Sequence, residues 1–374
     1  MNPTKEKLNN GCRNILICGA YGANNMGDES MLKAVILEMR AIQPQAHICV
    51  VTRAPEETKA LYGVDAIFTF DFAALHREMK KADVYINGGG SLIQNITSRR
   101  SLRYYLYTIK LAKKCGCTVL MYGCGIGPLN HGYDRRLTAK ILNSCVDAIT
   151  LRDPESAVLL KEIGVTEPEV VLAADPVLSL SAGDATEADA FMEEAGMEKD
   201  GNYICFALRP WQGMEGKQET ILKVLRTVYN ELGLTPVFMP MNYSLDLDIA
   251  EKTAKNAGVP CIVLPEIKSA ELAISLMARM KLAVSMRLHA ALFAASAGIP
   301  GIALSYDPKV SSFMEYTGCG KTIELEDLTE ENLTELIRLL CSADNKSEFD
   351  ESLRKVKQAE SLNMLTAKRL MNLE

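Results

Sequence analysis

Four side chains suited to holding an anion follow apolar runs of the sequence. Arg209 follows YICFAL, Arg287 and His289 follow LAVSM, and Lys309 follows GIALSYDP. Guanidinium and ammonium groups bind carboxylate and phosphate, and an imidazole can also exchange a proton near neutral pH. The four residues predict a site for a small anion. The alternative for His289 is a histidine that only completes a helix start.

The stretch KLAVSMRLHAALFAASAGIPGIALSYDPK predicts the elements that would gather these groups. Residues 282–284 are expected to form a strand, residues 290–297 a helix and residues 301–306 a second strand. Ser285 is the expected N-cap, and Gly298 stands at the usual stop position. The two strands should be parallel, so their carboxyl ends meet at one sheet edge, where open α/β folds bind ligands.

Length and composition favour a globular protein with two α/β domains. The chain has 374 residues, of which 48% are hydrophobic and 24% charged. A net charge of -6 argues against a nucleic-acid binder. The polar N-terminus and the lack of a long apolar run predict a cytoplasmic protein. Eleven cysteines without a CxxC pair, and only four histidines, predict no metal site.

Alternating strands and helices predict two doubly wound domains. The first spans residues 12–179, and the second spans residues 180–345. The small and acidic residues of 181–200 interrupt the alternation, which places the boundary near them. Residues 346–374 are expected to form one amphipathic helix that packs back on the first domain.

Two glycine runs in the first domain are expected to be loops that follow strands. GGGS follows an expected strand at 84–87, and GCGIGP follows one at 118–122. Glycine allows a backbone or a ligand to approach closely. A triple glycine is a weak signal, because a tight turn explains it equally well.

The loop GAYGANNMGDES after the first strand supports two interpretations. Its glycines fall at positions 19, 22 and 27, so it is neither a dinucleotide fingerprint nor a P-loop. Asp28 and Glu29 suit a helix start for structural reasons alone. Alternatively, Tyr21, Asn24 and Asn25 face a neutral, hydroxylated ligand together with Asp28, since acidic residues repel phosphate.

The segment from about Ser101 to Lys114 is an amphipathic helix with a basic approach. Its cations are Arg99, Arg100, Arg103, Lys110, Lys113 and Lys114. A solvated basic face is the ordinary explanation. The alternative is a peripheral contact with anionic lipid, or with a phosphate on a carrier.

Seven motifs in a fixed order give the chain a family resemblance. They are GAYGANNMGDE, NGGGSLIQ, RDPES, ADPV, LRPW, MRLHA and SYDPKV. Together they resemble the polysaccharide pyruvyl transferase family, closest to its bacterial cell-surface-anchoring (S-layer-associated) members. The resemblance implies two Rossmann-like domains facing each other across a cleft, as in GT-B glycosyltransferases, with a last helix that crosses back. It also implies transfer of pyruvate from phosphoenolpyruvate onto a sugar as a cyclic ketal, with release of phosphate.

The resemblance also implies roles for particular residues. Phosphoenolpyruvate would bind Arg209, Arg287, His289 and Lys309, with Arg287 and His289 catalytic and His289 the acid. The expected acceptor is β-N-acetylmannosamine of a lipid-linked secondary cell-wall polymer, held by Tyr21, Asn25, Asp28, Ser91 and Arg152. Close relatives often carry an aromatic residue where this chain has Ala23, so the acceptor is less secure than the donor.

These roles set the expected partners. No cofactor or metal is expected, and the enzyme would work in the cytoplasm at the inner face of the membrane. A homo-oligomer stays open.

Two other functions remain open at the level of sequence. One is a nucleotide-sugar glycosyltransferase or epimerase on the same fold, although the glutamate that such enzymes use to hold a ribose has no counterpart with the right spacing. The other is a non-catalytic anion- or glycan-binding protein. A comparison of binding by uridine diphosphate and by phosphoenolpyruvate would separate these functions.

Overall fold

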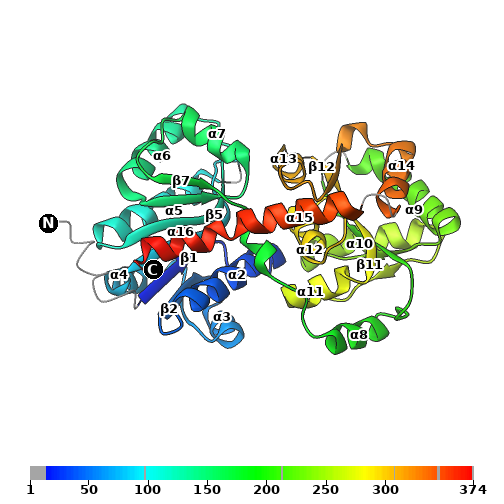
Figure 1. The fold of residues 1–374 in the computed structure, drawn as a ribbon, viewed down its shortest axis with the longest axis horizontal. Helices are drawn as coiled ribbons and strands as arrows, with labels where there is room; N and C mark the ends of the chain where they lie inside the picture. Colours follow the sequence, from blue (N-terminus) through cyan, green and yellow to red (C-terminus); the bar gives the residue numbers. More distant parts are fainter. Residues whose placement is uncertain (1–13, 97, 212–213, 307, 343–345, 373–374) are drawn as a thin grey trace. The chain divides into compact units, whose positions relative to one another are not determined.

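The chain divides into two compact units (Figure 1). Unit 1 consists of Met1–Pro176 and Gln358–Glu374, and unit 2 of Val177–Lys357. The computed structural model describes all residues except 1–13, 97, 212–213, 307, 343–345 and 373–374. The observed boundary after Pro176 lies close to the one expected at residue 179.

In the described part of unit 1, parallel strands form one sheet in the order β3-β2-β1-β4-β5-β6-β7. The strands are β1 (Asn14–Cys18), β2 (His47–Thr52), β3 (Asp65–Phe68), β4 (Val84–Ile93), β5 (Thr118–Ile126), β6 (Ala148–Leu151) and β7 (Glu169–Leu172). The helices are α2 (Met26–Ile42), α3 (Pro55–Tyr62), α4 (Phe72–Lys81), α5 (Arg99–Lys114), α6 (Gly132–Cys145), α7 (Pro154–Glu162) and α16 (Leu362–Leu370).

Alternation along β1 builds a core on each face of this sheet. Leu16 and Cys18 belong to one apolar cluster, which includes residues of α4, α5 and α6. Ile15 and Ile17 point to the opposite face, into a cluster with residues of α2 and α16. Helices therefore cover both faces, as a doubly wound fold requires.

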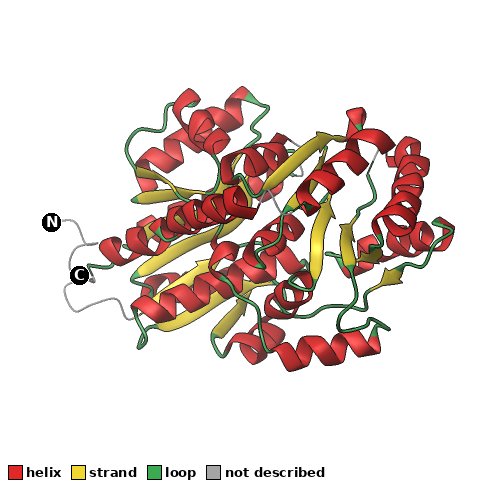
Figure 2. Ribbon diagram, turned by 45° about the vertical axis from the view of Figure 1, so that its right-hand side comes forward, coloured by secondary structure: helices red, strands yellow, loops and turns green. Residues whose placement is uncertain are grey.

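Unit 2 contains a sheet of its own, and Figure 2 draws the strands of the structure in yellow and the helices in red. Across the described residues of unit 2 the sheet runs β10-β9-β8-β11-β12-β13, all parallel. Its strands are β8 (Tyr203–Ala207), β9 (Thr235–Phe238), β10 (Ile262–Val263), β11 (Met280–Ser285), β12 (Gly301–Ser305) and β13 (Gly320–Glu324). Its helices are α8 (Ala185–Glu194), α9 (Gln218–Leu232), α10 (Tyr243–Asn256), α11 (Ala270–Met277), α12 (Leu288–Ser296), α13 (Pro308–Thr317), α14 (Glu330–Cys341) and most of α15 (Lys346–Glu360).

The sheet of unit 2 has the strand order 3-2-1-4-5-6 and that of unit 1 has the same order with a seventh strand added, and in each sheet the strand order reverses direction between the first and fourth strands. The predicted α/β class with two parallel sheets is confirmed. Ligand sites are expected at the carboxyl ends of β1 and β4 in unit 1, and of β8 and β11 in unit 2.

The structure corrects several predicted elements. The glycine runs expected to be loops continue β4 to Ile93 and β5 to Ile126, because Gly88 and Gly90 pair with β5. Residues 181–200 contain helix α8, which packs on α11 within unit 2. Strand β13 was not predicted. The single C-terminal helix is two helices, α15 and α16.

The C-terminal segment belongs to unit 1 from Gln358 onward. Ala367 and Met371 lie in the core beneath the sheet, and the Asn363 side chain donates a 2.8 Å hydrogen bond to the carbonyl of Ala174. The segment therefore contributes part of the packing of unit 1. None of the helices in the described residues is long and apolar enough to cross a bilayer.

Candidate functional site

Unit 2 carries its cations at the carboxyl ends of adjacent strands. Ala207 of β8 pairs with Ser285 of β11, so Arg209 and Arg287 each stand two residues beyond a paired position. Strand β12 lies on the other side of β11 and leads directly into Tyr306. The chain reversal of this sheet is therefore flanked by two arginines.

Arg287 is fixed by a buried carboxylate. Its Nε donates to Oδ2 of Asp246 at 3.1 Å, and its Nη2 donates to Oδ1 of the same residue. Asp246 has no exposed surface and also accepts a 2.9 Å hydrogen bond from the backbone N–H of Asn242 at the start of α10. This two-point contact fixes the plane of the guanidinium and directs Nη1 away from the carboxylate.

The backbone at Arg287 is held as well. Ser285 was expected to be the N-cap of α12, but Arg287 occupies that position. The Ser285 hydroxyl instead accepts from the N–H of Arg287 at 2.9 Å and donates to its carbonyl at 2.7 Å. The turn from β11 into α12 is thereby closed by one side chain.

Arg209 is held by aromatic rings rather than by a carboxylate. Its Nη1 donates to the Tyr306 hydroxyl, and its Cζ lies 5.0 Å from the Tyr306 ring centre and 5.1 Å from that of Trp211. The two rings stack with centroids 4.0 Å apart. Among the described residues, no carboxylate forms an ion pair with Arg209, and cation–π contacts do not neutralise its charge.

His289 is the second residue of α12, and it is partly exposed. Six consecutive residues after it, from Ala290 to Ala295, are buried, so the helix is anchored in unit 2. Lys309 lies in the first turn of α13, but its side chain is outside the described residues. Of the predicted donor-binding residues, the structure therefore places Arg209, Arg287 and His289 along one sheet edge.

In unit 1, Tyr21 and Asn25 shape the loop after β1. Tyr21 is 1% exposed and donates a 2.7 Å hydrogen bond to the carbonyl of Gly88. Asn25 is the N-cap of α2, accepting from the N–H of Gly27 at 3.2 Å and donating to Asp28 Oδ2 at 2.6 Å. Tyr21 was expected to hold the acceptor. In this structure its side chain is buried and its hydroxyl contacts β4, so it supports the loop.

Asp28 lies close to the glycine run of β4. A Cβ atom at Gly90 would lie 3.5 Å from Oδ1 of Asp28. Burial raises the pKa of Asp28 to about 6, while the hydrogen bond from Asn25 opposes the shift. The carboxyl group can therefore gain or lose a proton near neutral pH.

Ser91 and Arg152 lie together beside the glycine run of β5. A Cβ at Gly125 would lie 2.7 Å from Ser91 Oγ and 3.2 Å from Arg152 Nε. Arg152 donates to Ser91 Oγ at 3.2 Å and to Oδ2 of the fully buried Asp175 at 2.8 Å. The charge of Arg152 is therefore compensated inside unit 1.

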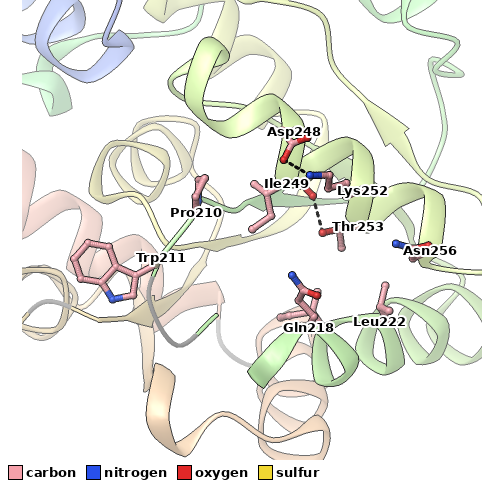
Figure 3. Close-up of a pocket in the computed structure, with 10 residues that line it drawn as sticks. Pro210, Trp211, Gln218, Leu222, Asp248, Ile249, Lys252, Thr253 and Asn256 are labelled. Atoms are coloured by element: carbon pink, nitrogen blue, oxygen red, sulfur yellow. Dashed lines mark hydrogen bonds and ion pairs between the residues drawn. The ribbon is translucent and has the colours of Figure 1, made fainter. Parts of the chain in front are cut away.

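A cavity of about 520 Å³ lies beside this edge of unit 2 (Figure 3). Its wall is formed by Pro210, Trp211, Gln218, Ile221, Leu222, Asp248, Ile249, Lys252, Thr253 and Asn256. Lys252 and Asp248 form a 2.7 Å ion pair on this wall. Arg209, Arg287 and His289 do not line this cavity, so it is a neighbouring space and not the predicted anion site.

The sequence missed the partners that hold the charged groups. Asp246 holds Arg287 and Asp175 holds Arg152, yet neither was singled out as a partner. Asp175 stands in the ADPV motif, and Asp246 opens the helix that follows a neighbouring strand. Their positions at strand ends were the available signal. Among the described residues, no group of three or more His, Cys, Asp or Glu could hold a metal ion.

Comparisons with known proteins give a family and a fold. The family model described as "Polysaccharide pyruvyl transferase" matches residues 25–308. A comparison with curated proteins found no match.

Several solved structures are similar in fold. UDP-GlcNAc 2-epimerase from Methanocaldococcus jannaschii has a TM-score of 0.62 at 12% identity, over 89% of this chain and 93% of that chain. The S. aureus MnaA–UDP co-structure has a TM-score of 0.63 at 13% identity, over 97% and 98%. Anabaena Alr3699/HepE with UDP and glucose has a TM-score of 0.61 at 11% identity, over 96% and 100%. At these identities the likeness concerns the fold alone, and it confirms the predicted GT-B-like class.

Proposed function

The chain belongs to the polysaccharide pyruvyl transferase family, and we propose that it transfers pyruvate from phosphoenolpyruvate onto two hydroxyls of an N-acetylhexosamine. The observation that carries this proposal is the edge of unit 2. There, Arg287 is oriented by Asp246 and Arg209 by two aromatic rings, and His289 follows in the first turn of α12.

The donor fits this edge by charge. Phosphoenolpyruvate carries a carboxylate and a phosphate, and both match the planar fork of an arginine. We assign Arg209, Arg287 and Lys309 to neutralising these groups. The N-terminus of α12 adds its own N–H groups and dipole, which favour an anion at the same place.

His289 is the proposed acid. Protonation of the vinyl carbon makes the central carbon electrophilic, and a first sugar hydroxyl adds there and loses its proton. Phosphate then leaves with its electron pair, and the second hydroxyl closes the ketal and loses its proton. Two protons leave the sugar hydroxyls, and two are taken up, one by the new methyl group and one by the released phosphate. The reaction therefore balances without a redox partner. The scheme involves no metal or cofactor.

We assign the acceptor to unit 1. Asn25, Asp28 and Ser91 offer hydrogen-bonding groups near glycines that leave room for a sugar, while Arg152 holds Ser91 and Tyr21 supports the loop. By resemblance, the acceptor is β-N-acetylmannosamine of a lipid-linked secondary cell-wall polymer of the kind that anchors an S-layer. The enzyme would then act at the inner face of the membrane.

The test couples two products. Purified protein is mixed with phosphoenolpyruvate and a β-N-acetylmannosaminyl acceptor, and phosphate release is measured together with the mass of the acceptor. Equal amounts of phosphate and of acceptor carrying ketal-bound pyruvate are expected. Phosphate release without a modified acceptor, for every N-acetylhexosaminide tried, would contradict the proposal.

The solved structures of similar fold suggest the competing function, that of a nucleotide-sugar enzyme. Two of them are described with UDP bound, so calorimetric titration with UDP serves as the parallel arm. Tight binding of UDP and none of phosphoenolpyruvate would favour a nucleotide-sugar enzyme. For the proposed cell-wall role, ketal-bound pyruvate should disappear from the host's cell-wall polymer when the gene is deleted.

A further inference from the structure

An exposed aromatic cluster lies on unit 1, at the carboxyl end of the edge strand β3. It comprises Phe68, Phe70, Phe72 and Tyr107, which are between 45% and 54% exposed. Their rings form a chain of edge-to-face contacts through Tyr104, with centroid separations from 5.7 to 6.5 Å. Isolated exposed aromatic side chains are ordinary, but a contiguous group marks an interaction site.

Hydrogen bonds hold the elements that carry this aromatic cluster. The Tyr104 hydroxyl donates a 2.9 Å hydrogen bond to the carbonyl of Thr69, which ties helix α5 to the loop that carries Phe70. Asp71 caps α4 by accepting from the N–H of Ala74 at 2.8 Å, which fixes Phe72 in the first turn. The aromatic side chains are therefore presented by an ordered scaffold.

A basic stripe runs along α5 on both sides of Tyr107. Arg100, Arg103, Lys110 and Lys114 are exposed, and their spacing from Tyr107 puts them on the same helix face. Arg99 and Lys113 are excluded from this stripe because they form ion pairs with Asp134 and Asp147.

The neighbouring helix α4 extends the positive surface. It packs against α5 and adds exposed Arg77. Asp71 and Glu78 are the acids on this helix, and Glu78 is paired with Lys81. The surface is thus locally basic on a chain whose net charge is -6.

We propose that this aromatic and basic surface of α4, α5 and the loop after β3 docks on an anionic lipid membrane. Aromatic rings sit well at the level of lipid headgroups, and each Lys or Arg near an anionic surface contributes about 1 kcal/mol. Neither property alone selects a bilayer. Their combination on one face does, since a purely basic face would need no exposed phenylalanines.

The inference deepens the proposed function by naming the surface that would bring unit 1 to a lipid-linked acceptor. Its test needs no turnover, so it can fail or succeed independently of that function. Full-length protein is sedimented with vesicles of phosphatidylcholine alone and with vesicles that contain phosphatidylglycerol. Binding is expected only to the anionic vesicles, and it should fall steeply with added salt.

Two variants separate the contributions. R100E/R103E/K110E should reduce anionic-vesicle binding by at least tenfold, and F70S/F72S by about threefold to tenfold. Matched controls lie on unit 2. K252E/R338E/K355E makes the same change in net charge at exposed ion-paired positions, and L245S removes an exposed apolar side chain. Both controls should bind vesicles like the unchanged protein.

Three results would overturn the inference. They are equal binding to neutral vesicles, equal loss in the unit 2 controls, and binding to a single-stranded oligonucleotide in place of vesicles. Aromatic and basic surfaces also suit single-stranded nucleic acid, which makes the last arm necessary.

Discussion

The two sheet edges of this molecule share a topology and differ in how their arginines are held. In unit 1, Arg152 is buried against Asp175, and the carboxyl edge is lined by glycines, Asn25, Asp28 and Ser91. In unit 2, the partners of Arg209 among the described residues are aromatic rings and a hydroxyl, and Arg287 keeps part of its fork beyond Asp246. Strand order therefore decides where a ligand binds, whereas charge compensation decides which ligand binds.

Burial acts in opposite directions on an arginine and on a carboxyl group at the edge of unit 1. Burial alone would lower the pKa of Arg152, but Asp175 and Asp153 outweigh it and raise the pKa. Burial raises the pKa of Asp28 to about 6, so this carboxyl group at the same edge exchanges its proton just below neutral pH. In unit 1 the arginine is therefore compensated by carboxylates, and a carboxyl group that titrates near neutral pH remains at the edge.

The largest expected effect comes from removing the proposed acid at the unit 2 edge. His289→Ala should lower kcat by about 10² to 10⁴, the usual contribution of a positioned acid. The affinity for phosphoenolpyruvate, measured by calorimetry, should change far less. An unchanged kcat would remove His289 from this role, and a matching loss of affinity would make it a binding residue instead.

The next largest effect is expected at the buried ion pair between Arg152 and Asp175 in unit 1. Asp175→Ala leaves Arg152 buried without its partner, which should cost about 3 to 5 kcal/mol of the free energy of unfolding. Denaturant unfolding measures this cost. The control is Glu169→Gln, because its pair with Arg369 is exposed and should contribute about 0 to 1 kcal/mol. Similar costs for the two variants would mean that Arg152 does not depend on Asp175.

A smaller effect is expected at Asp246, the carboxylate that orients Arg287 in unit 2. Asp246→Asn keeps the shape but weakens two hydrogen bonds to Arg287, so the affinity for phosphoenolpyruvate should fall roughly tenfold to a hundredfold, or about 1.4 to 2.8 kcal/mol. If only the charge of Asp246 mattered, its removal would increase the affinity for phosphoenolpyruvate, because one negative charge near the anionic ligand would be lost. A gain in affinity would therefore contradict orientation by Asp246.

Two further variants isolate this effect. Asp248→Asn lies on the same helix, where its ion pair with Lys252 is exposed, and should leave the affinity nearly unchanged. In an Arg287→Ala background, Asp246→Asn should have little additional effect on binding, since its action passes through Arg287.

The sequence predicted structural features that are set by residues close together in the chain, and it missed features that are set by contacts between distant residues. Arg209, Arg287 and His289 were found because each follows an apolar strand, and strand ends are locally visible. The extension of β4 through Gly88 to Ile93 was missed because it depends on pairing with β5. Helix α8 was missed although Ala, Glu and Met favour a helix and Asp184 caps it, because the break in the alternation of strands and helices suggested a linker.

The same limit applies to the site. Asp246 and Arg287 are separated by 41 residues, and Asp175 and Arg152 by 23. No periodicity connects such pairs, so the sequence indicated the cations without showing which of them are compensated. Tyr21 is the reverse case, since a motif position suggested a ligand contact and packing against Gly88 gave it a supporting role.

A buried pair of acids in unit 1, Glu38 and Glu360, sharpens the comparison, because here two groups of like charge lie together. Burial, followed by the charge of the neighbouring Glu38, raises the pKa of Glu360 to about 9, and Tyr122 donates a hydrogen bond to Glu38. The pKa of Glu360 is higher in the folded state than its ordinary value of 4.5. The folded state therefore binds more protons than the unfolded state between these values, and stability must fall as pH rises through this window.

Glu360→Gln should remove that dependence, because an amide is neutral at every pH. We expect the variant to be more stable than the unchanged protein at pH 8, on the order of 2 kcal/mol, and nearly equal to it at pH 4. Thermal unfolding at both pH values measures the difference. Glu351→Gln on the same helix loses only an exposed pair with Lys355 and should show no such gain. An equal gain for Glu351→Gln would assign the effect to net charge and not to burial of Glu360. A loss for Glu360→Gln at pH 8 would show that the acids at Glu38 and Glu360 stabilise unit 1 as charged groups.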